Sequence, residues 1–85
     1  MKYKDAIVQR FDELYKYKKV SIPKVSFRAA VSSSTFYSMR KPERREVSSD
    51  TVKKMCDGLG ISVYDFYDDD IFKDLELEIN ESENN

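Results

Sequence analysis

Residues 21–41, SIPKVSFRAAVSSSTFYSMRK, carry the pattern that most constrains the fold of this chain. Ile22, Val25, Ser26 and Ala29 have the i, i+3, i+4, i+7 spacing of one buried helix face. Ser32 follows at a position where its hydroxyl group can cap a further helix. The segment therefore predicts two short helices that pack closely across a sharp turn.

The second of these helices is expected to run from Ser33 to about Arg40, and Pro42 would prevent its extension. Phe36 and Met39 would face inward. The outward face would carry small hydroxyl groups, one phenol and a terminal cation, from Ser33, Ser34, Tyr37, Ser38 and Lys41. A slim polar face of this kind suits the groove of a nucleic-acid duplex.

The flanking sequence predicts three more helices, one before this pair and two after it. The first covers residues 4–18, where Ile7, Phe11 and Leu14 lie on one apolar stripe. Ser21 is a natural cap for the helix that follows, and Pro23 falls in its first turn, where a missing amide hydrogen costs little.

After an exposed loop over residues 41–47, a fourth helix is expected from about residue 48 to a left-handed cap at Gly60. Ser62 and Asp65 resemble a capping box that opens a fifth helix. The apolar side chains of that helix are expected to close the core: Val63, Phe66 and Tyr67.

Three segments together carry a family resemblance: AAVSSSTF at residues 29–36, DTVKKMCDGLGIS at 50–62 and VYDFYDD at 63–69. From about Ile7 to Phe72 the chain resembles the lambda-repressor-like helix-turn-helix family, the Cro/XRE group of bacterial and phage regulators. The resemblance implies a compact all-α, five-helix DNA-binding domain over residues 1–72, with the third helix in the major groove. Residues 73–85 would form a short acidic C-terminal tail.

The formal net charge of −1 conceals a strong separation of charge along the 85 residues. Residues 16–45 contain nine basic and one acidic residue, a net charge of +8, whereas residues 46–85 contain three basic and twelve acidic, a net charge of −9. A positive block around the helix pair is what a phosphate backbone favours. We therefore expect a double-stranded DNA operator as partner, with phosphate contacts from Ser21, Lys24, Arg28, Lys41, Arg44 and Arg45.

By the same resemblance, base recognition falls to Ser33, Ser34, Tyr37 and Ser38. Family members often carry glutamine, arginine or asparagine there, and their paired hydrogen bonds each contribute about 1–3 kcal/mol of discrimination. None of these side chains is on this face, so selectivity is expected to depend on Tyr37, on thymine methyl groups and on DNA shape. Helix capping is the alternative role of the serines.

Several positions depart from the family pattern. Lys19 and Ala30 stand where glycine is common, and a positive φ at Ala30 would be strained. Tyr15 and Arg40 replace an ion pair, so a cation over the tyrosine ring is a candidate substitute. Phe27 is outward by the helix period; we expect it to pack across the first helix, with a partner surface as the alternative.

The residue inventory disfavours an enzyme. With no histidine and one cysteine, the chain lacks the commonest general base and an internal disulfide. Cys56 shares helical spacing with Val52, Met55 and Leu59, which indicates a core thiol. Asp68–Asp70 are neighbours in a polar run, which favours solvation over metal binding. We expect no cofactor and no metal site.

No run approaches the roughly 18 apolar residues of a membrane span, and the start MKYKDAIV lacks the apolar stretch of a secretion signal. A cytoplasmic protein is therefore expected.

Two functions remain open at this point. The first is a sequence-specific transcription regulator, a repressor, that binds its operator as a homodimer through the fifth helix and residues 71–79. The second is an antitoxin or modulator whose acidic segment, residues 65–83, binds a basic protein. Leu75, Leu77 and Ile79 alternate, which indicates a short strand or a docking segment, and the last six residues are expected to fray.

Overall fold

The computed structural model describes residues 1–79, which form α-helices and one 3-10 helix and contain no β-strand. The elements are α1 (Tyr3–Tyr17), α2 (Ile22–Ala29), α3 (Ser33–Ser38), α4 (Ser49–Leu59), α5 (Val63–Tyr67) and the 3-10 helix η1 (Asp70–Phe72). The predicted all-α, five-helix fold is confirmed over this range. The helix ends fall within about two residues of those predicted, which is the usual spread at helix termini.

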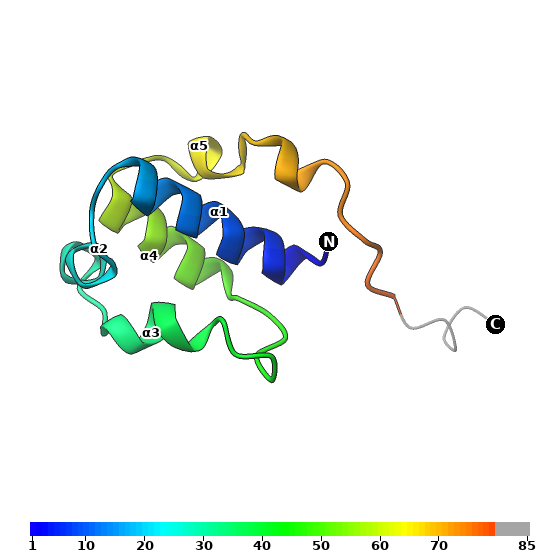
Figure 1. Cartoon of the computed structure of the whole chain (residues 1–85), viewed down its shortest axis with the longest axis horizontal. Helices are drawn as coiled ribbons and strands as arrows, with labels where there is room; N and C mark the ends of the chain where they lie inside the picture. The colour runs from blue at the N-terminus through cyan, green and yellow to red at the C-terminus, as the bar shows by residue number, and fades with distance from the viewer. Residues whose placement is uncertain (80–85) are drawn as a thin grey trace.

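The helices are arranged around α1 and α4, which lie side by side (Figure 1). The short helix α2 packs across one end of this pair, mostly against α4, and α3 follows on one side. On the opposite side, α5 and η1 cover α1 and α4. The two helices predicted to bind DNA, α2 and α3, therefore pack on a scaffold made by the other elements.

The core lies where these elements meet. Its fully buried side chains come from every α-helix: Ile7, Phe11, Val25, Phe36, Met55, Cys56 and Phe66. Phe11 and Phe36 lie with ring centroids 5.1 Å apart and so join α1 to α3. Burial of such side chains stabilises the fold by about 1.5–3 kcal/mol each.

Gly58 permits the closest approach of two helices. The residue is buried on α4, and a methyl group there would lie 2.6 Å from Val25 Cγ1 and closer still to the Val25 carbonyl oxygen on α2. Only a residue without a side chain fits this crossing. The position of α2 against α4 therefore depends on Gly58.

The helix caps predicted at Ser21, Ser32 and Ser62 are confirmed, and Ser48 caps α4 in the same way. The hydroxyl groups of four serines each accept a hydrogen bond from a first-turn amide: Ser21 from Lys24, Ser32 from Ser34, Ser48 from Thr51 and Ser62 from Asp65. Gly60 ends α4 with a φ of 74°. Lys19 and Ala30 also have positive φ values, 56° and 57°, which glycine adopts without strain and other residues seldom do.

Two packing predictions need correction. Phe27 is 85% exposed and does not pack across α1, because it lies on the outward face of α2 with Lys24 and Arg28. Val63 is 39% exposed, since the aromatic rings of Phe66, Tyr67 and Phe72 close that side of the core instead. Helix α3 ends at Ser38, two residues before the predicted end, which is within the usual spread at helix termini.

Arg10 fastens α5 to α1, a role that the sequence did not reveal. Its guanidinium group donates to the carbonyl oxygens of Asp65 and Phe66 at 2.8 Å and pairs with the Asp69 carboxylate at 3.2 Å. These bonds satisfy carbonyl groups at the end of α5 that lack helical partners. The charge of Arg10 is thus used within the fold.

Residues 73–79 run past the N-terminus of the chain (Figure 1). The Met1 ammonium group pairs with Glu76 at 3.1 Å, and the Glu76 amide donates to the Met1 carbonyl oxygen at 3.0 Å. The predicted short strand is absent, and Leu77 and Ile79 are 85% and 62% exposed. The predicted frayed end falls on residues 80–85, outside the described residues.

Candidate nucleic-acid interface

The candidate recognition helix, α3, is anchored from beneath. Phe36 is fully buried and Met39 is 5% exposed, so the helix has one fixed orientation against the core. Tyr37 is half exposed and Ser34 is exposed, whereas Ser33 and Ser38 are only partly accessible. The four predicted base-recognition residues therefore differ in reach, and Tyr37 projects the largest side chain.

Two of the serine hydroxyl groups have partners within the helix. Ser34 Oγ lies 2.9 Å from Ser32 Oγ, and Ser38 Oγ donates to the Thr35 carbonyl oxygen at 3.4 Å. Both hydroxyl oxygens keep lone pairs that a base amino group could use. The cap role assigned to Ser32 is confirmed, and Tyr37 is the side chain with the widest access to a groove.

Cationic side chains lie on both sides of α3. Lys24 and Arg28 are exposed on α2, and Lys41, Arg44 and Arg45 are exposed in the loop that follows α3. Within residues 1–79, none of these five lies within 4.0 Å of a carboxylate, in contrast to Arg10, Arg40, Lys53 and Lys73. Exposed cations without internal partners are available to phosphate groups.

Ser21 has a different position from the other predicted phosphate contacts. Its hydroxyl oxygen accepts the Lys24 amide hydrogen at 3.2 Å, which fixes the start of α2. The hydroxyl proton remains available for a further acceptor. Ser21 can therefore cap the helix and contact a phosphate oxygen at the same time.

One hollow shows that the loop at residues 41–47, here called the arginine loop, lies beside α3. It has a volume of about 570 Å³, and its lining includes Thr35 and Ser38 of α3, Arg44 and Glu46 of the loop, and Ser48 and Ser49 at the start of α4. The structure therefore brings Arg44 together with the accessible side of α3. Lys24 and Arg28 belong to α2, which packs against α3.

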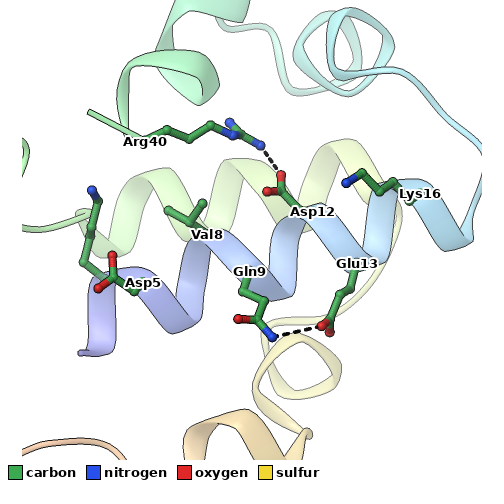
Figure 2. Close-up of a pocket in the computed structure, with 8 residues that line it drawn as sticks. Asp5, Val8, Gln9, Asp12, Glu13, Lys16 and Arg40 are labelled. Carbon is green, nitrogen blue, oxygen red and sulfur yellow. Dashed lines mark hydrogen bonds and ion pairs between the residues drawn. The ribbon is translucent and has the colours of Figure 1, made fainter. Parts of the chain in front are cut away.

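The loop is held at its start by contacts with α1. Arg40 pairs with the Asp12 carboxylate and donates to the Phe36 carbonyl oxygen, and Figure 2 shows Arg40 reaching across to Asp12. Lys4 is 9% exposed, and its ammonium group donates to the Lys41 carbonyl oxygen at 3.1 Å. These contacts fix the backbone from which the loop cations project.

The predicted stacking of Arg40 on Tyr15 is wrong in its partner. Arg40 pairs with Asp12 because the carboxylate, one turn before Tyr15 on α1, is the stronger acceptor for a guanidinium group. The Lys16 ammonium group lies over the Tyr15 ring instead, 6.0 Å from its centroid. Burial, followed by the nearby Asp12 charge, raises the pKa of Tyr15 above its usual value.

The other perturbed groups belong to the packing of the fold. Burial raises the pKa of the Cys56 thiol to about 11, so the thiol is protonated at neutral pH. Burial also raises the pKa of Tyr67, whose hydroxyl group shares a hydrogen bond with Tyr3. Within residues 1–79, no three acidic or cysteine side chains gather as metal ligands would, and Asp68–Asp70 are included in that range.

No protein-family model matches the chain, and no curated protein is similar to it in sequence. The chain is similar to a solved structure, the crystal structure of the prophage Lp1 protein 11. The two share 28% sequence identity with a TM-score of 0.75, over 88% of this chain and 100% of that chain. The chain therefore shares the fold of this prophage protein over most of its length. No helix within residues 1–79 is long and apolar enough to cross a bilayer.

Proposed function

We propose that the protein is a sequence-specific regulator of transcription that binds double-stranded DNA, with α3 in the major groove and α2 and the loop at residues 41–47 on the phosphate backbone. It acts in the cytoplasm as a repressor, a homodimer that occupies an operator and blocks polymerase. The Cro/XRE resemblance of the sequence and the similarity to a prophage protein both support this class.

One observation carries the proposal. Five exposed cations without carboxylate partners among residues 1–79 lie on the elements that flank a short, polar and firmly anchored helix. Lys53 and Lys73, by contrast, pair with the carboxylates of Asp57 and Asp70. The five cations outnumber the two exposed carboxylates of the loop, Glu43 and Glu46, so the surface next to the polar helix has a net positive charge. Such a surface matches a DNA backbone on either side of its groove.

The proposal is tested by selecting bound fragments from random duplex DNA and measuring the mobility of a selected site against competitor DNA. Tyr37→Ala is expected to lower affinity for the selected site about tenfold, because contacts to base edges contribute about 1–3 kcal/mol each. Tyr17→Ala is the matched control, since Tyr17 is 83% exposed at the end of α1 and away from α3. Equal binding by the two variants, or no enrichment of any sequence, would contradict the proposal.

The antitoxin or modulator remains the second candidate because the acidic C-terminal segment exposes Leu77 and Ile79. That function predicts the opposite dependence on charge. Neutralising Glu76 and Glu78 would abolish its activity, whereas removing Arg44 and Arg45 would leave the activity intact.

A further inference from the structure

We infer that Glu78 occupies a basic hollow that receives DNA phosphate, so that the C-terminal segment competes with DNA for the arginine loop. The inference rests on the proposed function, and it adds a regulatory contact to the same surface. It follows from the position of one acidic side chain of the C-terminal segment among cations from two other segments, residues 2–4 and 40–45.

The hollow has a volume of about 640 Å³ and lies between the N-terminus, the loop after α3 and the C-terminal segment. Five cationic side chains and two carboxylates line it. The cations exceed the carboxylates by three, so the hollow attracts anions. The carboxylates are Asp5 of α1 and Glu78 of the C-terminal segment.

Two of the five cations are already engaged within the fold. The Lys4 ammonium group donates to the Lys41 carbonyl oxygen, and Arg40 pairs with Asp12. Lys2, Arg44 and Arg45 are exposed and line the hollow without a carboxylate within 4.0 Å among residues 1–79. These three side chains form the part of the hollow that can bind a phosphate group.

The contacts of residues 76–78 explain why Glu78 lies there. Glu76 holds the segment to Met1 through the ammonium pair and the backbone hydrogen bond. The Tyr3 amide donates to Glu78 Oε2 at 3.3 Å, at the positive end of the α1 dipole. The segment thus carries its negative charge along the end of the molecule where the arginine loop also lies (Figure 1).

These contacts are strong enough to place the segment and weak enough to be displaced. Exposed ion pairs typically contribute less than about 1 kcal/mol, and salt screens them over about 10 Å at 0.1 M. Duplex DNA presents one negative charge for about every 1.7 Å of its axis, so it displaces a single carboxylate from the hollow that the arginines line. Glu78 therefore lowers the affinity for every phosphate polymer by a similar factor and leaves base recognition unchanged.

The test compares Glu78→Gln with Asp74→Asn, which removes the same charge from an exposed residue of the same segment that does not line the hollow as residues 1–79 form it. Two probes are titrated: a mixed-sequence 20-base-pair duplex and inorganic tripolyphosphate. At about 50 mM salt, Glu78→Gln is expected to bind both probes about two- to fivefold more tightly than the unmodified protein. The gain should vanish at about 200 mM salt, and Asp74→Asn should give a smaller gain.

The outcomes separate this inference from the proposed function. If Glu78→Gln binds both probes no more tightly than Asp74→Asn does, or if neither probe binds at all, competition by Glu78 is refuted. If tripolyphosphate shows the gain while no variant binds duplex DNA, Glu78 competes with phosphate for the hollow, and the DNA-binding function fails. Thermal unfolding of both variants, expected to match the unmodified protein, shows that the fold is unchanged.

Discussion

Arg10 and Arg40 are held by contacts within the fold, whereas Arg44 and Arg45 project from the exposed loop that follows Arg40. The guanidinium group of Arg10 bonds to two carbonyl oxygens and one carboxylate, and that of Arg40 to one of each. Arg44 and Arg45 have no carboxylate within 4.0 Å among residues 1–79. Arginine side chains therefore stabilise the scaffold in one region and remain available for a partner in the other.

This difference shows what net charge along a sequence can and cannot tell. The positive block at residues 16–45 includes Arg40, although its charge is neutralised by Asp12 on α1. An interface is defined by the cations that the fold leaves without internal acceptors. The expected effects of substitution should therefore divide into losses of stability on one side and losses of DNA affinity on the other.

The largest effect on stability is expected for Arg10→Ala. The substitution removes three hydrogen bonds from a charged group that is 15% exposed, so the free energy of unfolding should fall by about 2–3 kcal/mol. Urea unfolding measures this loss. DNA affinity measured below the unfolding transition should be unchanged; a loss of affinity at unchanged stability would break the division between the two regions.

Gly58→Ala tests the scaffold beneath the interface. Alanine favours a helix over glycine by about 1 kcal/mol, but the added methyl group would overlap Val25 on α2, and overpacking costs about 1–3 kcal/mol. A net loss of stability of about 1 kcal/mol is therefore expected in the same unfolding measurement. A stabilised variant would show that α2 does not approach α4 as closely as described.

The smallest effect is expected at the turn between α2 and α3. Ala30→Gly relieves a left-handed φ of 57°, so the free energy of unfolding should rise by about 0.5–1 kcal/mol. Ala29→Gly, one residue earlier in the helix, is the control and should destabilise the protein. DNA affinity should not change for Ala30→Gly, since the orientation of α3 depends on Phe36 rather than on this turn.

Local patterns in the sequence predicted most of the fold. Helical periods, the serine caps and Gly60 are short-range signals, because each depends on residues within one or two turns. The sequence also placed Phe36, Met39 and Cys56 in the core correctly. These successes share one physical reason, which is that each signal depends on residues close together in the chain.

The errors involve contacts between residues far apart in the chain. The partner of Arg40 is 28 residues away, and the acceptors of Arg10 are 55 to 59 residues away, so no local spacing reveals them. Val63 was expected to pack in the core, but Phe72 packs against the core instead. The 3-10 helix at Asp70–Phe72 brings Phe72 there, and the sequence did not predict this helix because the aspartates at 68–70 form a polar run. For the candidate site, the sequence assigned Arg44 to phosphate and Arg40 to a contact with α1, and the fold corrects the partner of Arg40 from Tyr15 to Asp12.

Phe27 remains without a role in either region. Its side chain is 85% exposed between Lys24 and Arg28, and its expected packing on α1 is absent. A partner surface that includes Phe27 stays a prediction.

The salt dependence of DNA binding tests the central claim most directly. Arg44→Ala with Arg45→Ala should lower the affinity and reduce the slope of log K against log salt by about 1.8, which is about 0.9 for each lost phosphate contact. The matched control, Lys53→Ala with Lys73→Ala, removes two charges that pair with Asp57 and Asp70, and should leave the slope unchanged. Equal slopes for the two double variants would contradict the assignment of the loop arginines to DNA.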